Sequence, residues 1–307
     1  MKVTVTGVAG HFGSFLAGRL LTHGIEVVGV DTLLYGEAGL QALRPRSGFR
    51  FEQADICDGL PPSCDETDAV VHLAALVGPV CERDPQRAWQ VNRDATALLC
   101  DWAARRGVRL LFASTCSNYG VCEGMATEET PLRPLGVYAQ TKVAAEERVA
   151  ELGTTGVTLR FGTLAGISPR PRFDTLLNQL TAEACVAGRI TCYRPQARRP
   201  FTHLDDASQA VLELLTRWSS ARHRCYNIVG FNTTVRALAE VIQEYTHCDI
   251  QESPEAADGR DYAVSAARVA ADLGVRPRVG LAPCVQEVCA AIRSGAVTPK
   301  REHYNVR

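Results

Sequence analysis

Short apolar runs alternate with helical segments along the first half of the chain. "KVTVTGV" is rich in β-branched residues, and "AVVHLAAL" and "VRLLFAST" are almost continuously apolar, as is typical of strands buried on both faces of a sheet. Between such runs, "HFGSFLAGRLLTHG" has helical spacing and ends on Gly24, and Pro85–Arg106 reads as a long helix. This alternation predicts an α/β fold built on a doubly wound parallel sheet.

The second half of the chain is less regular. Segments rich in proline and arginine, "ISPRPRF" and "CYRPQARRPF", interrupt expected helices at about 174–187 and 205–218. A strand, "CYNIVG", and a helix, "VRALAEVIQEY", follow. Because there is no low-complexity linker and no internal repeat, we expect a smaller, mixed C-terminal lobe folded back against the sheet domain. The expected division is 1–162 with 200–229 for the sheet domain, and 163–199 with 230–307 for the lobe.

Composition excludes several classes of function. The chain has 307 residues, 46% of them hydrophobic and 22% charged, and a formal net charge of -1 without a basic block, so no nucleic-acid partner is expected. It has no run of about 18 apolar residues and begins with a strand, not with a cleavable signal, so we expect no membrane span and a cytoplasmic protein. The 12 cysteines form no C-x-x-C pair, which predicts neither a metal site nor a disulfide framework. The final segment, "TPKREHYNVR", is expected to be a loosely held terminus.

A glycine-rich turn joins the first strand to the first helix. Gly7, Gly10 and Gly13 are spaced G-x-x-G-x-x-G, and glycines there let the helix N-terminus approach a pyrophosphate closely. Asp31 ends the second strand, where a carboxylate can accept both ribose hydroxyls of NAD and would repel the 2′-phosphate of NADP. The alternative is a structural turn with a surface aspartate, but the order of these elements favours NAD as the cofactor.

Other segments come in an order that suits the same cofactor cleft. Asp55 and Ile56 could read an adenine edge, the small residues of "HLAAL" would let the cofactor lie against the backbone, and Asn92 could donate to it. The predicted cofactor residues are Gly7, Gly10, His11, Phe12, Gly13, Asp31, Asp55, Ile56, Leu73, Ala74, Ala75, Asn92, Ser114, Tyr138 and Lys142.

Lysine is rare in this chain. Of 33 lysines and arginines, only Lys2, Lys142 and Lys300 are lysines. The one that lies away from the termini comes four residues after Tyr138, so the two side chains would share one face of a helix. Any long helix can supply this pair by chance, so its meaning depends on the surrounding motifs.

The motifs together resemble those of one known family. "TGVAGHFG", Asp31, Asp55, "HLAA", "STCSNYG" and Tyr138-x-x-x-Lys142 have the order of the extended short-chain dehydrogenase/reductase family, in its branch of nucleotide-sugar epimerases and dehydratases. The resemblance covers nearly the whole chain and implies a Rossmann-type fold. It also implies a homodimer formed through helices at about Pro85–Arg106 and Val137–Leu152, although the same apolar positions could instead face the sheet.

The resemblance implies that Thr115, Tyr138 and Lys142 are catalytic. A tyrosine with a pKa of about 10 is a poor base at neutral pH. A cation one helical turn away, together with oxidised nicotinamide, would stabilise the phenolate and lower that pKa. A lysine can also reach the nicotinamide ribose, which the broader guanidinium of an arginine would not do equally well.

The same resemblance implies a nucleoside-diphosphate sugar as the substrate. Arg199 and Arg260 match positions at which related enzymes bind the diphosphate, although in an arginine-rich chain either could be a solvated surface residue. Thr163 stands where many relatives carry a substrate-binding asparagine, and Asn178 could supply the amide instead. Two residues on the loop after Thr115 could touch the sugar. These are Ser117 and Asn118.

The type of reaction depends on the two residues directly after Thr115. Dehydratases of this branch place acidic residues at these positions because elimination needs a general acid and a general base. Here the positions are occupied by Cys116 and Ser117, which favours 4-epimerisation through a transient 4-keto intermediate. The alternatives are a 4-keto-sugar reductase, a 4,6-dehydratase that takes its acid from Glu82 or Asp84, and a non-catalytic NAD-binding sensor.

Overall fold

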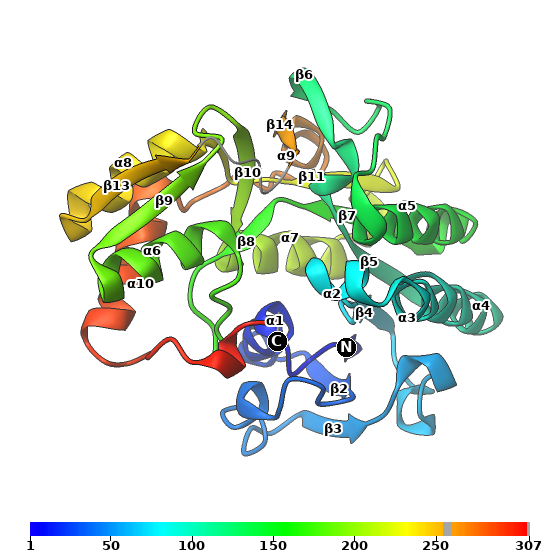
Figure 1. Cartoon of the computed structure of the whole chain (residues 1–307). Coiled ribbons are helices and arrows are strands. Elements are labelled where there is room, and N and C mark those ends of the chain that lie inside the picture. The colour runs from blue at the N-terminus through cyan, green and yellow to red at the C-terminus, as the bar shows by residue number, and fades with distance from the viewer. Residues whose placement is uncertain (254–258, 306–307) are drawn as a thin grey trace.

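The computed structural model describes residues 1–253 and 259–305 and is built around a parallel sheet of seven strands (Figure 1). The sheet has the order β11-β7-β5-β4-β1-β2-β3, so the direction of strand addition reverses beside β1. All neighbouring strands pair in parallel, which confirms the predicted doubly wound α/β fold. The strands are β1 (Lys2–Thr6), β2 (Glu26–Asp31), β3 (Phe49–Gln53), β4 (Ala69–His72), β5 (Arg109–Thr115), β7 (Gly156–Phe161) and β11 (Cys225–Ile228).

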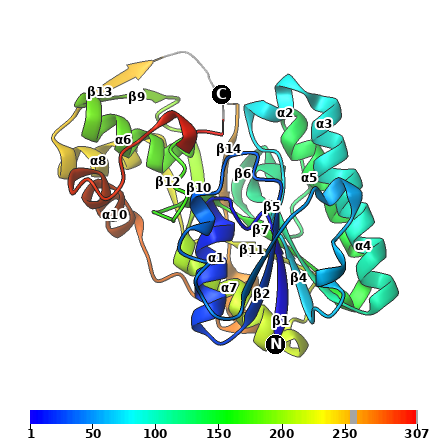
Figure 2. The ribbon, with the colours of Figure 1, turned by 90° about the horizontal axis from the view of Figure 1, so that it is seen from below.

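Helices cover both faces of the sheet, as Figure 2 shows. On one face, apolar side chains of α1 (His11–Thr22) and α7 (Leu204–Thr216) share a core with β1 and β7. On the other face, α4 (Ala95–Arg106) and α5 (Gly136–Ala150) pack against β2, β4 and β5. Strands buried on both sides explain the nearly continuous apolar runs in the sequence. In the described part of the chain, no helix combines the length and the apolar character needed to cross a bilayer.

The long helix expected at Pro85–Arg106 exists, but it is not uniform. It consists of α3 (Pro85–Trp89), a π-helical turn (Gln90–Asp94) and α4. A short helix, α2 (Pro79–Arg83), precedes it. Wide turns of this kind occur mostly as isolated bulges inside α-helices, and this one carries Asn92 toward the loop after β4.

A smaller, mixed lobe is formed by segments on either side of α7 and β11, as expected. Its strands form one sheet of three strands, in the order β12-β10-β8, and a separate pair of β13 with β9. Helices α6, α8 and α10 share one core with these strands. The proposed domain boundaries fall between β7 and β8, within β10, and between β11 and β12. The elements are β8 (Thr163–Ala165), α6 (Leu176–Ala187), β9 (Arg189–Tyr193), β10 (Arg198–His203), β12 (Phe231–Thr234), α8 (Val235–Thr246), β13 (Asp249–Ser253) and α10 (Leu281–Arg293).

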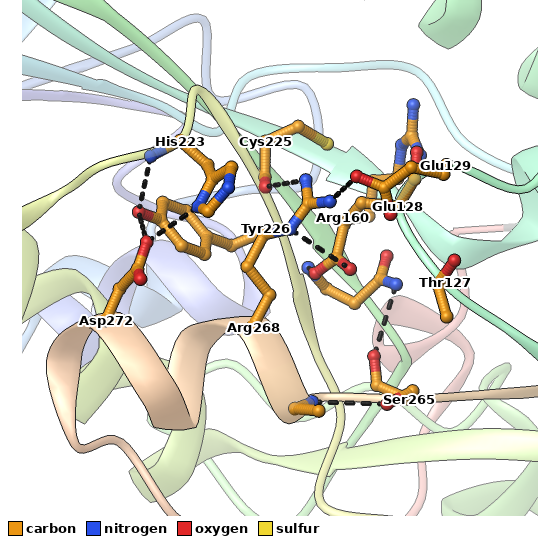
Figure 3. Close-up of polar contacts among 12 residues, drawn as sticks. Thr127, Glu128, Glu129, Arg160, His223, Cys225, Tyr226, Ser265, Arg268 and Asp272 are labelled. Carbon is orange, nitrogen blue, oxygen red and sulfur yellow. Dashed lines mark hydrogen bonds and ion pairs between the residues drawn. The ribbon is translucent and has the colours of Figure 1, made fainter.

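The outer edge of the large sheet at β11 is closed by polar contacts (Figure 3). Helix α9 (Ala267–Leu273) provides Arg268, whose Nη1 donates to the carbonyl oxygen of Cys225 at 3.3 Å. The carboxylate of Glu128 lies 3.6 Å from Nε of Arg268 and accepts from the backbone N–H of Asn227 at 2.8 Å. Glu128 follows β6 (Val121–Ala126), which pairs with β14 (Asp261–Val264). These contacts cover an edge that would otherwise expose backbone donors and acceptors.

The C-terminal segment is held in place, so the expectation of a loosely held terminus is wrong for its described part. In Figure 1 the red segment after α10 passes below α6 and returns toward α1. The backbone N–H of Phe173 donates to the carbonyl oxygen of His303, and the N–H of Asn305 donates to the carboxylate of Asp174, both at 3.0 Å. The last two residues, 306–307, lie outside the described residues.

Candidate active site

A cavity of about 1150 Å³ lies along the carboxyl ends of the sheet strands, between the sheet domain and the smaller lobe. Its wall combines the glycine-rich turn, the ends of β2, β4 and β5, helix α5, and segments of the lobe. In open α/β sheets, ligands bind at this edge, where the strand order reverses. The cavity is therefore the candidate active site.

The glycine-rich turn forms a cradle that has no room for side chains. Gly7 has a φ of +73°, and a Cβ atom on it would lie 2.8 Å from the backbone nitrogen of Ala74. A Cβ atom on Gly13 would lie 2.1 Å from the carbonyl oxygen of Gly7. Gly10, His11 and Phe12 also line the cavity, where α1 begins. Backbone N–H groups at a helix N-terminus suit a diphosphate, so these residues fit the predicted cofactor.

Asp31 connects this cradle to the end of β2. Its Oδ2 accepts from the N–H of Ala9 at 3.0 Å, and its Oδ1 accepts from the N–H of Leu33 at 2.8 Å. Burial raises the pKa of the Asp31 carboxyl, although these backbone hydrogen bonds act in the opposite direction. Each carboxylate oxygen keeps a further lone pair, so Asp31 could still accept ribose hydroxyls.

Asp55 and Ile56 line the same end of the cavity, together with Leu73, Ala74 and Ala75. The carboxylate of Asp55 lies 2.6 Å from Nη2 of Arg87 and accepts from the N–H of Cys57 at 2.9 Å. Burial alone would raise the pKa of Asp55, but the hydrogen bonds from these two residues outweigh it and lower the pKa. Sequence analysis did not identify Arg87 as a residue of this wall.

Asn92 does not line the cavity, contrary to its predicted role as a cofactor donor. It is buried, and its amide is used within the protein. Its Oδ1 accepts from the N–H of Leu76 at 2.8 Å, and its Nδ2 donates to the carbonyl oxygen of Leu76 at 3.0 Å and to Oγ1 of Thr141 at 3.1 Å. Asn92 therefore ties the loop after β4 to α5.

The three predicted catalytic residues meet on one part of the cavity wall. Tyr138 and Lys142 project from α5, and Thr115 ends the neighbouring strand β5. Burial raises the pKa of Tyr138 to about 12, and the cations Arg172 and Arg260 and a hydrogen bond with Thr115 oppose that shift. The ordinary state of this phenol is therefore neutral.

Lys142 is almost fully buried beside this phenol. Its Nζ lies 3.9 Å from the centroid of the Phe112 ring, a cation–π contact. Burial lowers the pKa of Lys142 to about 7, although the nearby carboxylate of Glu146 raises it. The charge on Lys142 therefore depends on its anionic neighbours at neutral pH.

Glu146 was not identified from the sequence, although it lies one helical turn after Lys142. Its Oε2 lies 2.6 Å from Nη2 of Arg160, and both side chains are buried. Glu146 also accepts from the Ser114 hydroxyl and, at 2.8 Å, from Nδ2 of Asn118. Ser114 itself lines the cavity, so this ion pair supports the strand end that carries the candidate catalytic threonine.

The two residues expected to touch the sugar do not line the cavity. Asn118 is buried and bonded to Ser114 and Glu146, while the Ser117 hydroxyl lies 2.9 Å from Oγ1 of Thr115. Both side chains therefore shape the loop after β5, and their predicted sugar contacts have no support in this geometry.

On the substrate side, three of the four remaining predicted residues line the cavity: Thr163, Arg199 and Arg260. Nη1 of Arg199 donates to the carbonyl oxygen of Arg260, so two segments far apart in the sequence meet here. Asn178 does not reach the cavity. Its amide bonds both backbone groups of Gly166 and, at 2.9 Å, the carbonyl oxygen of Arg172, and so holds the loop after β8.

That loop contains cavity residues that sequence analysis missed. "ISPRPRF", read only as an interruption between elements, provides Arg170 and Arg172 to the wall. Arg172 forms a two-pronged contact with Asp174, with Nε and Oδ1 2.8 Å apart. The second proline- and arginine-rich segment provides Arg194, and the C-terminal segment provides Asn305. The feature of the sequence that could have indicated these cavity residues is the clustering of arginines beside prolines in both segments.

The architecture and these residues agree with one protein family. A model of the NAD dependent epimerase/dehydratase family matches residues 3–229. The chain belongs to this family. NAD is accordingly its cofactor, and the chain is an enzyme of the NAD-dependent epimerase and dehydratase kind.

Its relatives include both types of enzyme. The chain is 28% identical to the UDP-glucose 4-epimerase of Corynebacterium glutamicum over 270 residues, 80% of each chain. It is 32% identical to the dTDP-glucose 4,6-dehydratase of Streptomyces griseus over 310 residues, 91% of this chain and 90% of the other. The crystal structure of UDP-glucuronic acid 4-epimerase from Bacillus cereus, in complex with UDP-glucuronic acid and NAD, has a TM-score of 0.86 at 22% identity and covers 96% of this chain and 99% of that one. This likeness shows the fold.

Proposed function

We propose that the protein is an NAD-dependent nucleotide-sugar 4-epimerase that acts through a transient 4-keto intermediate. The observation that supports this most is the meeting of Thr115, Tyr138 and Lys142 on one cavity wall beside the glycine cradle, with no acidic side chain directly after Thr115. The similarity to UDP-glucose 4-epimerase supports the same reaction.

In this proposal Tyr138 takes the proton from the C4 hydroxyl of the sugar. Its pKa is raised to about 12 even with Arg172, Arg260 and the hydrogen bond with Thr115 acting on it, so the positive charge of oxidised nicotinamide would be needed to lower that pKa for Tyr138 to act as a base near neutral pH. Lys142, one helical turn away on α5, supplies a positive charge when it is protonated, which its pKa of about 7 permits near neutral pH. NAD held by the glycine cradle and Asp31 would supply a hydride acceptor for C4 and, once reduced, a hydride donor to the keto sugar.

The surroundings of Thr115 disfavour dehydration. Cys116 is buried, its Sγ donates to the carbonyl oxygen of Arg160 at 3.2 Å, and burial raises the pKa of its thiol well above the ordinary value. Ser117 does not face the cavity. Neither residue can therefore act as the general acid that elimination requires.

Two carboxylates are candidates for a substitute acid. Glu82 accepts from the N–H of Val137 at 2.7 Å, at the start of α5, and does not line the cavity. Asp84 does line it, and it also caps α3 by accepting from the N–H of Arg87 at 3.0 Å. Asp84 keeps dehydration as the second candidate function, which the similarity to dTDP-glucose 4,6-dehydratase favours.

We further propose that Arg199 and Arg260 bind the diphosphate of a nucleotide sugar. Both line the cavity, and a guanidinium can engage phosphate oxygens at two points. A purely NAD-sensing protein would need neither these cations nor a tyrosine and a lysine placed together beside the cofactor. A catalytic role therefore explains more of the side chains that line the cavity than a sensing role does.

A homodimer through α4 and α5 is also proposed. These helices lie side by side on one face of the sheet (Figure 2). Trp89 and Leu98, on α3 and α4, are large apolar side chains exposed to solvent in the single chain. Sedimentation at micromolar concentration should give twice the chain mass, and a monomer would exclude this arrangement.

The function is tested by its cofactor and its product. The purified protein is denatured, the released cofactor and its redox state are identified, and a panel of nucleotide sugars is screened. We expect bound NAD, 4-epimer products and no net consumption of cofactor. Tyr138→Phe should lower turnover by orders of magnitude while the fold survives. Net consumption of a reduced nicotinamide cofactor would identify a keto-sugar reductase instead.

A further inference from the structure

We propose that Arg170 binds the diphosphate of NAD and that the C-terminal segment, residues 301–305, holds it in position. This proposal depends on NAD being the cofactor and does not depend on the sugar reaction. It starts from a buried cation that has no carboxylate partner among the described residues.

Arg170 is only 2% exposed, yet it lies within ion-pair distance of no carboxylate in the described part of the chain. Its Nη2 donates to the carbonyl oxygen of Glu302 at 3.2 Å, and its buried Nε has no hydrogen-bond partner there. The buried guanidinium of Arg160, by contrast, is paired with Glu146. Burial lowers the pKa of Arg170 and the nearby Arg172 lowers it further, while the more distant carboxylates of Asp174 and Asp31 oppose that shift without pairing with the guanidinium. A buried charge is costly unless it is paired, so this site calls for an anion that a ligand brings.

The position of Arg170 indicates which ligand brings that anion. Its guanidinium stacks over the ring of Tyr35, 4.9 Å from the centroid, and Tyr35 follows Asp31 at the end of β2. Its carbonyl oxygen lies 3.3 Å from Nδ1 of His11, the first residue of α1. Both contacts lie on the cofactor half of the cavity. The carbonyl contact also ties the Arg170 backbone to the start of α1, where backbone N–H groups already favour a diphosphate.

Other polar atoms of cavity-lining residues also have no hydrogen-bond partner among the residues that the structure describes. They belong to residues that are more than nine-tenths buried, and a ligand with hydroxyl and phosphate groups would supply the missing hydrogen bonds. They are His11 Nε2, Thr175 Oγ1 and Asn305 Oδ1.

The C-terminal segment holds the Arg170 loop at three points. Glu302 accepts from Arg170, the carbonyl oxygen of His303 accepts from the N–H of Phe173, and the N–H of Asn305 donates to Asp174. The rings of Phe173 and His303 also pack with centroids 5.9 Å apart. Without this segment the Arg170 side chain would lose the hydrogen bond that orients it. Residues 301–305 are therefore positioning residues, and Arg170 contacts the ligand.

The test measures binding by calorimetry on cofactor-free protein, with NAD, ADP-ribose, adenosine and UDP as probes. For Arg170→Gln we expect at least about a tenfold loss of affinity for NAD and ADP-ribose, the factor that corresponds to about 1.4 kcal/mol. Adenosine has no diphosphate, so its affinity should stay unchanged. Arg170→Lys keeps the charge, so its affinity for NAD should lie between those of the wild type and Arg170→Gln. A chain ending at Lys300 should lose affinity for NAD several-fold and keep its affinity for adenosine.

Arg199→Gln is the matched control, because it removes a cavity arginine from the substrate half. It should keep NAD affinity and bind UDP more weakly. Wild-type NAD affinity in Arg170→Gln would overturn the proposal. Equal losses for NAD and adenosine would overturn it too, since they would indicate a structural role. A loss for UDP with NAD unaffected would move Arg170 to the substrate's diphosphate. None of these readings requires sugar turnover, so they stand or fall separately from the epimerase proposal.

Discussion

Glu146 and Arg160 form a buried ion pair behind the cavity wall, with Oε2 and Nη2 2.6 Å apart. Their position links three parts of the site. Glu146 lies on the helix that carries Tyr138 and Lys142, Arg160 lies on β7, and the pair contacts the strand end of Ser114. Loss of this ion pair should therefore affect both the stability of the domain and the position of the candidate catalytic residues.

Glu146→Gln should destabilise the protein by about 3–5 kcal/mol, because it leaves a buried arginine without its anion. Its exposed neighbour Glu147 is the matched control, and Glu147→Gln should change the free energy of unfolding by less than about 0.5 kcal/mol. Denaturant unfolding measures both. If Glu146→Gln were as stable as the control, the ion pair would not matter for folding. A double variant, Glu146→Gln with Arg160→Met, should lose less than the sum of the two single variants.

The glycine cradle gives a second prediction. Gly13→Ala would place a methyl group 2.1 Å from the carbonyl oxygen of Gly7, so the turn must move, and NAD binding should be lost or weakened by at least about a hundredfold. Gly18 is the control on the same helix, where a Cβ would meet no atom closer than 3.8 Å. Gly18→Ala should keep NAD binding and add about 0.5–1 kcal/mol of stability. Calorimetry with NAD would contradict this account if both variants bound equally well.

The sequence predicted those features that depend on local spacing. The strand and helix alternation, the glycine turn and the four-residue interval between Tyr138 and Lys142 are all properties of short stretches, and the structure has the elements they imply. The smaller lobe was also expected, although its arrangement of separate small sheets could not be derived from residue order.

The sequence could not show which polar side chains are used inside the protein. Asn92, Asn118 and Asn178 are all amides near the cavity, and each is bonded to backbone or side-chain groups brought close only by folding. The reverse error occurred for Arg170 and Asn305. They come from an irregular loop and from the end of the chain, where no periodic pattern indicates a neighbour, and tertiary contacts place both on the cavity wall.

Lys142 should make stability depend on pH in the cofactor-free protein. Burial lowers its pKa from 10.5 to about 7, so the cost of burying the ammonium is fully present below pH 7. Between about pH 7 and pH 10.5 the unfolded chain still binds this proton while the native protein does not, so stability from this group rises with pH. The slope should approach about 1.4 kcal/mol per pH unit.

Lys142→Met removes this ammonium and keeps a flexible apolar chain. The difference in unfolding free energy between variant and parent should shrink steadily from pH 7 to pH 9.5, as contributions of other groups cancel. The carboxylate of Glu146 and the thiol of Cys81 act on Lys142, and the buried imidazole of His72 also interacts with it electrostatically. A difference that is independent of pH would mean that Lys142 keeps an ordinary pKa in the folded chain.

Removal of positive charge should separate the two halves of the cavity. Arg199→Ala and Arg260→Ala should each raise KM for the nucleotide sugar by at least about tenfold, because a charge-assisted contact with phosphate contributes about 1.5–3 kcal/mol. Bound NAD should be retained in both, as measured by the cofactor released on denaturation. Unchanged KM in both variants would require the diphosphate of the substrate to bind elsewhere.

Isotope exchange should distinguish epimerisation from dehydration. Both reactions begin with oxidation at C4, but elimination then removes the C5 proton and expels the C6 hydroxyl, which needs a general acid. Cys116 is buried and bonded to a backbone carbonyl, and Ser117 is directed to Thr115, so neither can serve as this acid. In D2O the 4-epimer should therefore form with no deuterium at C5, and none at C4, because the same hydride returns. Mass spectrometry and proton NMR of the product measure both positions.

Deuterium at C5, or a 4-keto-6-deoxy product, would show that an acidic side chain elsewhere on the cavity wall completes the elimination. Asp84→Asn would then identify it, because this variant should abolish the exchange while leaving oxidation at C4 intact.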